Sequence, residues 1–140
     1  MVRFMPEDWP IPALDRFNRD FFTTGKLVVQ QCTACETVQH PPDAACNNCK
    51  AMDFRSLETN GEGVIYSYIV VHNPPAPALA EAVPYTVVLV ALSEHPHVRI
   101  LGNVLNREPG AVAIGQMVRA TFEEIVDEDE TLLMPQWEVV

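Results

Sequence analysis

The residues with the clearest chemical potential are four cysteines in two closely spaced pairs. Cys32 and Cys35 form the first Cys-x-x-Cys pair, and Cys46 and Cys49 form the second pair, ten residues further on. Four thiolates at this spacing are typical of a tetrahedral site for one metal ion. Four protein ligands leave no open coordination position, so the pattern predicts a structural metal site. The chain has no other cysteine that would serve as a nucleophile.

Two other uses of paired cysteines can be weighed against this interpretation. Disulfides need an oxidising compartment, and the first twelve residues carry acids and prolines instead of the apolar stretch of a signal peptide. A rubredoxin-like iron site uses the same ligands. The bend after each pair often contains glycine, however, and here it holds Glu36 and Lys50. We therefore expect one structural zinc per chain in a cytoplasmic protein, and a rubredoxin-like electron carrier remains the alternative.

The charge balance is strongly acidic, with 19 Asp and Glu against 9 Lys and Arg and a net charge of −10. Such a surface repels nucleic-acid phosphates, so we expect no nucleic-acid partner. Six of the acids lie between Glu123 and Glu130, where we expect a solvated hairpin turn. No apolar run approaches the ~20 residues that cross a bilayer, so no membrane association is expected.

Three regions are expected to position the cysteines, the first being an N-terminal helical extension over residues 1–25. Within it, residues 12–25 have the apolar spacing of an amphipathic helix, with Pro12 at its start and Gly25 at its end. Residues 26–58 form a zinc ribbon, with strands over 26–31 and 54–57 on either side of the cysteine pairs. The ribbon has too few apolar residues to fold alone, so metal binding would supply the missing stability.

The third region, residues 59–140, has a β pattern throughout. Turn signals separate five expected strands, at 63–71, 85–92, 97–104, 117–126 and 132–139. Five strands in a region of this size favour an OB-fold barrel. The predicted fold class is therefore mainly β, with an N-terminal helix, a four-cysteine zinc ribbon and a C-terminal five-stranded OB-fold barrel. Because OB-folds and ribbons often bind single strands, a single-stranded nucleic-acid-binding protein is the second alternative.

Six residues are candidates for contact with a partner or with a ligand. Phe21 and Phe22 lie on the apolar face of the expected helix. The other four lie in or next to the proline-rich loop of residues 73–84, which is long, apolar and stiff: His72, Pro75, Pro77 and Leu79. Proline-stiffened loops lose little entropy on binding. Packing of the aromatics and of the loop against the protein's own fold is the alternative for each.

Short motifs follow one another almost end to end along the chain: Gly25-Lys26-Leu27, Gln31-Cys32-Thr33-Ala34-Cys35, His40-Pro41-Pro42, Cys46-Asn47-Asn48-Cys49, Gly61-Glu62-Gly63-Val64-Ile65-Tyr66-Ser67, Pro84-Tyr85-Thr86-Val87-Val88-Leu89-Val90 and Gly115-Gln116-Met117-Val118. In the order of these motifs, the chain resembles the domain-of-unknown-function 35 family, whose members join a rubredoxin-like zinc ribbon to an OB-fold. A basic residue commonly follows the two prolines in relatives, whereas this chain has Asp43.

The resemblance implies an accessory role in acyl-CoA metabolism. Family members are similar to small subunits that pair with thiolase-fold enzymes, which are thiolases or thiolase-like aldolases acting on acyl-CoA thioesters. The implied protein is a non-catalytic subunit of a hetero-oligomer that stabilises the complex and contributes to the acyl-CoA site. The cysteine count agrees with this role, because thiolase chemistry needs a free cysteine nucleophile and this chain has none to spare. No catalytic residue is therefore expected.

Overall fold

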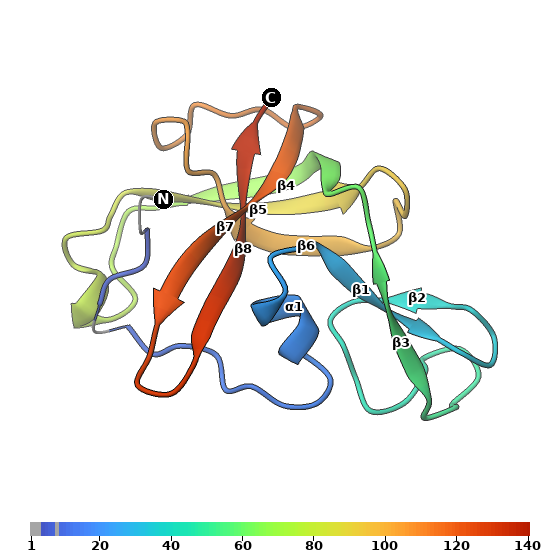
Figure 1. Cartoon of the computed structure of the whole chain (residues 1–140). Coiled ribbons are helices and arrows are strands. Elements are labelled where there is room, and N and C mark those ends of the chain that lie inside the picture. The colour runs from blue at the N-terminus through green and yellow to red at the C-terminus, as the bar shows by residue number, and fades with distance from the viewer. Residues whose placement is uncertain (1–3, 8) are drawn as a thin grey trace.

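A three-stranded antiparallel sheet carries the cysteine pairs in the computed structural model, which describes residues 4–7 and 9–140 (Figure 1). Strand β1 (Val28–Cys32) is central, with β2 (Val38–Gln39) on one side and β3 (Phe54–Glu58) on the other. The two strands expected on either side of the cysteine pairs are thus present as β1 and β3, and the short β2, which lies between them in the sequence, was not anticipated. A two-residue strand gives too little sequence for a periodic pattern.

The second sheet has five antiparallel strands in the order β6-β5-β4-β7-β8. Their bounds are β4 Glu62–Val71, β5 Tyr85–Leu92, β6 Arg99–Asn103, β7 Met117–Val126 and β8 Thr131–Val139. The two edge strands approach each other through a parallel bridge between Val104 and Trp137, and the N–H of Leu105 donates to the Trp137 carbonyl over 3.0 Å. This contact curls the sheet into a barrel, so the predicted five-stranded OB-fold is confirmed.

Close packing at the start of β4 explains one glycine of the Gly-x-Gly motif. A Cβ added at Gly63 would lie 2.5 Å from the side chain of Val90 and 2.6 Å from the carbonyl oxygen of Ala91. Two residues later the pairing of β4 with β5 shifts register between Ile65 and Ser67. Glycine and a register shift are the usual means of bending a strand around a small barrel.

The expected helix over residues 12–25 is much shorter in the structure, where α1 spans only Arg19–Thr23. The preceding residues form turns held by side chains. The Asp15 carboxylate accepts the N–H groups of Phe17 and Asn18 over 2.8 and 2.9 Å, and Asn18 Oδ1 accepts the N–H of Asp15. Asp and Asn compete in this way with the helical backbone. The end of the helix agrees better with expectation, since Gly25 follows it with a φ of 68°.

A second short helical element, the 3₁₀ turn η1 (Pro77–Leu79), lies in the proline-rich loop. Of the helices in the described part of the chain, none is long and apolar enough to cross a membrane.

The ribbon and the barrel share one hydrophobic core. Its members from the N-terminal part are Phe21, Leu27, Val28, Val29 and Val38, and they join a cluster whose barrel members include Ile65, Val88, Ile100 and Trp137. Helix α1 contacts both β8 of the barrel and β1 of the ribbon. The domain boundaries expected between residues 25 and 26 and between residues 58 and 59 remain predictions, because the shared core extends across both of them.

Candidate metal centre and neighbouring pockets

Each cysteine pair lies in a tight bend stabilised by the same two backbone hydrogen bonds. At the first bend, the N–H of Cys32 donates to the carbonyl of Thr37 and the N–H of Glu36 donates to the carbonyl of Cys32, both over 2.9 Å. The second bend repeats these bonds at equivalent positions: Cys46 N–H to Ala51 over 2.8 Å and Lys50 N–H to Cys46 over 3.0 Å. The ribbon therefore presents its two pairs in closely similar local geometry.

The residues that replace the expected glycines take the conformation that glycine favours. Glu36 has a φ of 64° and Lys50 a φ of 68°, and among the described residues they alone have positive φ without being glycine. For a residue with a Cβ, this left-handed region costs roughly 1–2 kcal/mol. The bends are thus built as the cysteine spacing predicts, with strain at both of them.

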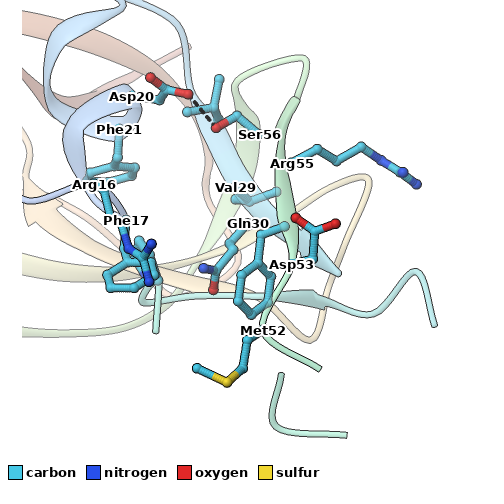
Figure 2. Close-up of a pocket in the computed structure, with 13 residues that line it drawn as sticks. Arg16, Phe17, Asp20, Phe21, Val29, Gln30, Met52, Asp53, Arg55 and Ser56 are labelled. Carbon is cyan, nitrogen blue, oxygen red and sulfur yellow. Dashed lines mark hydrogen bonds between the residues drawn. The ribbon is translucent and has the colours of Figure 1, made fainter. Parts of the chain in front are cut away.

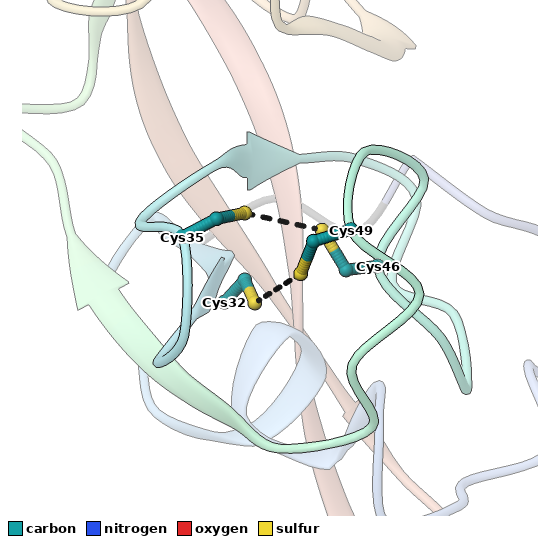
Figure 3. A group of neighbouring side chains, drawn as sticks. All are labelled: Cys32, Cys35, Cys46 and Cys49. Atoms are coloured by element: carbon teal, nitrogen blue, oxygen red, sulfur yellow. Dashed lines mark hydrogen bonds between the residues drawn. The ribbon is translucent and has the colours of Figure 1, made fainter.

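The four sulfur atoms converge on one point (Figure 3). The Sγ atoms of Cys32 and Cys49 are 3.6 Å apart, those of Cys35 and Cys46 are also 3.6 Å apart, and all four lie within 4.8 Å of one another. A tetrahedral zinc with bonds of ~2.3 Å to sulfur needs sulfurs roughly 3.8 Å apart. The donor set and its spacing therefore fit a four-coordinate metal ion.

The thiols also influence one another's ionisation. The Thr37 hydroxyl lies 3.0 Å from the Cys35 sulfur, and hydrogen bonds from Thr37 lower the pKa of Cys35 to about 6. A hydrogen bond from the Ala51 backbone lowers the pKa of Cys49, but the neighbouring thiols outweigh it and raise that pKa to about 11. Four adjacent thiolates therefore need a cation to balance them, as a metal ion would do.

A pair of buried glutamines fixes the chain between the two bends, and sequence reasoning missed it. Gln30 is 7% exposed and Gln39 is 5% exposed. Gln30 exchanges hydrogen bonds with the backbone of Asp43, donating to its carbonyl over 2.8 Å and accepting its N–H over 2.9 Å. Gln39 Oε1 accepts the N–H of Asn47, the residue after the third cysteine, over 2.9 Å. A buried amide that pairs with loop backbone gives no periodic signal in the sequence.

The two aromatic residues expected on the helix point into the protein's own fold. Phe21 is buried, and its ring lies 5.0 Å from Phe22 and 4.9 Å from His40, measured between ring centroids. Phe22 is half-buried and packs against the same core. Packing, the alternative to a contact role, thus accounts for much of both side chains, and the contact role stays a prediction.

One face of Phe21 borders a pocket of about 280 Å³ between α1 and the ribbon (Figure 2). Ser56 donates to the Asp20 carboxylate over 2.6 Å across this pocket. Its charged lining residues are two arginines and two aspartates: Arg16, Arg55, Asp20 and Asp53. Figure 2 shows the Arg55 guanidinium extending away from the other lining side chains. The pocket therefore lacks the excess of positive charge that a CoA phosphate would favour.

The four candidates in and beside the proline-rich loop divide into two groups. His72, Pro75 and Pro77 are exposed. Leu79 is 8% exposed and lines a second pocket, of about 290 Å³, on the barrel. At Leu79 the loop therefore folds back on its own barrel, while the other three residues stay free to contact a partner, which remains a prediction.

Glu123 corrects the expectation of a solvated acidic hairpin. The acids from Asp127 to Glu130 do lie at the exposed β7–β8 turn, but Glu123 is 0% exposed. Its Oε2 accepts the N–H of Phe4 and, over 2.8 Å, that of Met5. Within the described residues, its other oxygen has no hydrogen-bond partner. A segment 118 residues earlier in the chain covers this carboxylate, so the local pattern could not reveal its burial.

Comparison with known proteins agrees with this architecture. A model of the rubredoxin-like zinc ribbon domain of ChsH2 matches residues 19–55, and a model of the C-terminal OB-fold domain of ChsH2 matches residues 58–123. A DUF35 domain-containing scaffold protein of Methanocaldococcus jannaschii is 31% identical over 105 residues, covering 74% of this chain and 72% of that protein. The chain belongs to the DUF35 family.

Two further relatives of this DUF35 chain come from multi-subunit enzymes. A chain in the solved structure described as Ltp2-ChsH2(DUF35) aldolase is 35% identical, with a TM-score of 0.74 over 92% of this chain and 98% of that chain. A probable enoyl-CoA hydratase alpha subunit of Thermomonospora curvata is 41% identical over 112 residues, or 78% of this chain. The DUF35 chain spans only 34% of the length of that hydratase subunit.

Proposed function

We propose that this DUF35 protein is a non-catalytic subunit of a hetero-oligomer with a thiolase-fold enzyme that acts on acyl-CoA thioesters. The observation that carries the proposal is the match to the DUF35 chain of the Ltp2-ChsH2 aldolase, because it covers nearly all of both chains at 35% identity. The name of the Methanocaldococcus jannaschii relative, a scaffold protein, supports a structural role in place of a catalytic one.

The proposed cofactor is one structural zinc ion held by the four clustered cysteines: Cys32, Cys35, Cys46 and Cys49. The bends that present the cysteines, the sulfur spacing and the match to a zinc ribbon model support zinc. Four thiolates fill its coordination sphere, so the ion would link β1 to the second bend and supply no reaction chemistry. All four cysteines are free of disulfides, which supports a reducing, cytoplasmic location.

An exposed apolar patch on the barrel supports association with a partner protein. Val64 on β4 lies opposite Met117 on β7, and the N–H of Val140 donates to the Met117 carbonyl. Met117 is 57% exposed, and the nearby Ile114 and Val140 are 68% and 64% exposed. We call these four residues, Val64, Ile114, Met117 and Val140, the apolar patch. Contiguous apolar surface of this kind is typical of sites that another protein covers.

Co-expression tests the proposal directly. A tagged form of the chain is produced together with the thiolase-like protein whose gene lies nearest to its own. The complex is then purified, and its molar mass is measured by light scattering. We expect a stable hetero-oligomer, with activity or solubility of the partner above that of the partner alone. Met117→Glu should weaken co-purification. Val126→Glu should not weaken it, because Val126 has similar exposure but lies outside the apolar patch. Failure to co-purify with any thiolase-fold protein would contradict the proposal.

An enoyl-CoA hydratase is the second candidate partner, because the relative at 41% identity is named as a hydratase alpha subunit. The same co-expression with hydratase subunits distinguishes the two partners. The two alternatives from the sequence have simple tests of their own. Iron would colour the purified protein, and nucleic-acid binding would appear as salt-sensitive affinity for an oligonucleotide.

A further inference from the structure

The four cysteines of the cluster differ in their exposure to solvent. Cys32 and Cys46, the first cysteine of each bend, are fully buried, whereas Cys35 is half-buried and Cys49 is exposed. Two short sulfur contacts join the bends, Cys32 to Cys49 and Cys46 to Cys35, both over 3.6 Å (Figure 3). Each contact thus pairs a buried sulfur with a more accessible one, and a reagent in solution reaches the accessible sulfur first.

Hydrogen bonds distinguish the two more accessible sulfurs. The Thr37 hydroxyl lies 3.0 Å from Sγ of Cys35, and Asn48 Nδ2 donates to the same sulfur over 3.6 Å. Asn48 Nδ2 also donates to the Thr37 hydroxyl over 3.2 Å. In the described part of the chain, Cys49 accepts a backbone hydrogen bond from Ala51, and no side chain outside the cysteine cluster donates to it. Because hydrogen bonds that stabilise a thiolate weaken it as a nucleophile, Cys49 is expected to react faster than Cys35.

We propose that Cys49 is a modification site for small peroxides and that Cys32 completes the reaction as the resolving thiol. The inference does not depend on the proposed partner, but it rests on the proposed metal, which would hold the four sulfurs as thiolates. Thiolate character and exposure are the properties that govern cysteine oxidation. Of the four cysteines, all of which the structure describes, Cys49 alone is exposed.

The reaction balances with a peroxide as the only co-reactant. The Cys49 thiolate attacks one peroxide oxygen, the O–O bond breaks and hydroxide leaves, so that the sulfur becomes a sulfenic acid. The Cys32 thiolate then attacks this sulfur, the S–S bond forms, the S–O bond breaks and a second hydroxide leaves. Two thiolates have then passed two electrons to the peroxide, and both hydroxides take protons from the solvent. The two sulfurs start 3.6 Å apart and a disulfide is ~2.05 Å long, so the movement needed is short.

The disulfide would join the same two parts of the ribbon that the metal holds together. Cys32 ends β1, and Cys49 lies in the second bend. Only Cys35 and Cys46 would stay available as thiolates, which are too few ligands for a closed tetrahedral site. We therefore expect peroxide to release the metal while the ribbon stays folded. A dithiol reductant together with zinc should restore the original centre, because thiol–disulfide exchange is reversible.

Peptide mapping of the zinc-loaded, full-length chain tests the proposal. The chain is treated with limiting hydrogen peroxide while a chromophoric chelator reports released zinc, and the remaining thiols are then alkylated. Cleavage after Glu36 separates the two cysteine pairs, so a disulfide between the bends links two peptides and one within a pair does not. We expect a Cys32–Cys49 disulfide that forms in step with zinc release. A first disulfide within either pair, or zinc release without oxidation of Cys49, would overturn the proposal.

Alkylation rates of the native, zinc-loaded chain give a second readout that needs no variant. With limiting N-ethylmaleimide, Cys49 should react about tenfold faster than the buried Cys32 and Cys46, because reactivity follows exposure. Equal rates at all four cysteines, or a faster reaction at Cys35 than at Cys49, would overturn the proposal.

A pair of threonine variants tests the part played by hydrogen bonds. Thr37→Val removes the hydroxyl beside Cys35 and should speed alkylation of Cys35 without changing that of Cys49. Thr33→Val is the matched control, because the Thr33 hydroxyl donates to Asp53 and contacts no sulfur. If the two variants have the same effect on Cys35, hydrogen bonding does not set the order of reaction, and that argument for Cys49 is overturned.

Metal analysis before peroxide treatment separates this inference from the proposed cofactor. A chain that contains no zinc after expression with added zinc would overturn both. A chain that holds zinc and whose Cys49 resists peroxide would overturn the inference alone. The isolated chain is the sample throughout, so failure to co-purify with a thiolase-fold protein would contradict the proposed function and leave this inference in place.

Discussion

The side-chain Nε2 of Gln39 donates to Oε1 of Gln30 over 2.7 Å, and this bond joins two buried amides on adjacent strands of the ribbon. Gln39 also accepts the N–H of Asn47, and Gln30 accepts that of Asp43. The connection between the two cysteine pairs is thereby tied to β1 and β2. Hydrogen bonds thus help to position the second pair, whatever ion the four sulfurs hold.

Gln39→Leu should therefore weaken both the ribbon and its metal site. The change leaves the N–H of Asn47 without its acceptor, and a buried group left unsatisfied costs about 1–3 kcal/mol. Loss of a group that orients metal ligands typically lowers metal affinity 10–100-fold. Denaturant unfolding measures the first effect, and competition with a chromophoric chelator measures the second.

Gln31→Leu is the matched control, because Gln31 lies next to Gln30 on β1 but is only half-buried, and its side chain donates to the Glu36 carbonyl over 3.1 Å. We expect it to change the free energy of unfolding by less than about 1 kcal/mol. Equal effects of the two substitutions would show that the buried pair has no special part in placing the second cysteine pair.

Removal of the metal should destabilise the whole chain. Val28, Val29 and Val38 of the ribbon belong to the same core as the barrel, so loosening of the ribbon exposes barrel residues to water. We expect a chelator to lower the melting temperature by several degrees or more and added zinc to restore it, since a ligand of the native state alone stabilises it by mass action.

Cys46→Ser should mimic the chelator and make the protein insensitive to it. Elemental analysis should give about one zinc for the native chain, the stoichiometry of a single four-thiolate site, and a small fraction of that for the variant. A melting curve that chelator leaves unchanged in the native protein would contradict a structural metal.

Glycine at position 50 should be more stable than alanine there, the reverse of the usual order. Lys50 has a φ of 68°, where a Cβ is strained and glycine is not. Lys50→Gly and Lys50→Ala both remove the long side chain, so their difference isolates the backbone. We expect the free energy of unfolding of the glycine variant to be about 1 kcal/mol higher than that of the alanine variant, which is the cost of a Cβ in this region. Denaturant titration of both variants measures the difference. Equal stabilities would mean that this bend relaxes without cost.

Strands were the part of the fold that the sequence predicted best. The bounds expected for β5 and β7 match the structure at both ends. In β5 the buried Val88 and Val90 alternate with more exposed residues, and at the start of β7 the buried Val118 does the same. The convergence of the four cysteines was equally accessible to prediction, since the spacing of Cys-x-x-Cys pairs is fixed by the bend that each pair forms.

Long-range contacts explain what the sequence did not reveal. Alternation along β7 places Glu123 with Arg119 on the outward face, yet Glu123 and Ile125 of that face are 0% and 1% exposed. The N-terminal segment covers Glu123, and no local pattern encodes such a contact. The helix is shorter than predicted for a local reason. The side chains of Asp15 and Asn18 close turns at residues where the apolar spacing alone predicts a helix.

Acid should destabilise the fold through His40. Burial lowers the pKa of His40 to about 4, from an ordinary value of 6.5, and its ring packs on Phe21. Above pH 6.5 the imidazole is neutral in both the folded and the unfolded chain, so it does not make stability depend on pH. As the pH falls from 6.5 to 4, the unfolded chain takes up a proton that the folded chain does not. Stability should therefore fall by at most about 1.4 kcal/mol per pH unit in that window.

His40→Phe should reduce this slope, because phenylalanine fits the same aromatic contact and does not titrate. Denaturant unfolding at a series of pH values from 7 to 4, with native and variant compared at each, cancels the contribution of other groups. His72→Phe, at an exposed position, is the control and should keep the native slope. A native slope in the His40 variant would assign the acid sensitivity to other residues.

Glu123 should be needed as a hydrogen-bond acceptor and not as a charge. Its Oε2 accepts the N–H groups of Phe4 and Met5, while Oε1 is buried with no partner in the described part of the chain. Glu123→Gln keeps an acceptor oxygen and removes the cost of a buried charge, so we expect unchanged or higher stability. Glu123→Ala leaves two N–H groups without an acceptor and should cost about 1–3 kcal/mol.

Tryptophan fluorescence separates these variants, because Trp137 is 0% exposed and fixed in the core while Trp9 belongs to the segment that Glu123 holds. We expect a red shift for Glu123→Ala, as Trp9 becomes hydrated, and the native spectrum for Glu123→Gln. Glu124→Ala, at the exposed neighbouring position, should also keep the native spectrum. A red shift in the glutamine variant as large as in the alanine variant would show that the negative charge itself holds the N-terminal segment on the barrel.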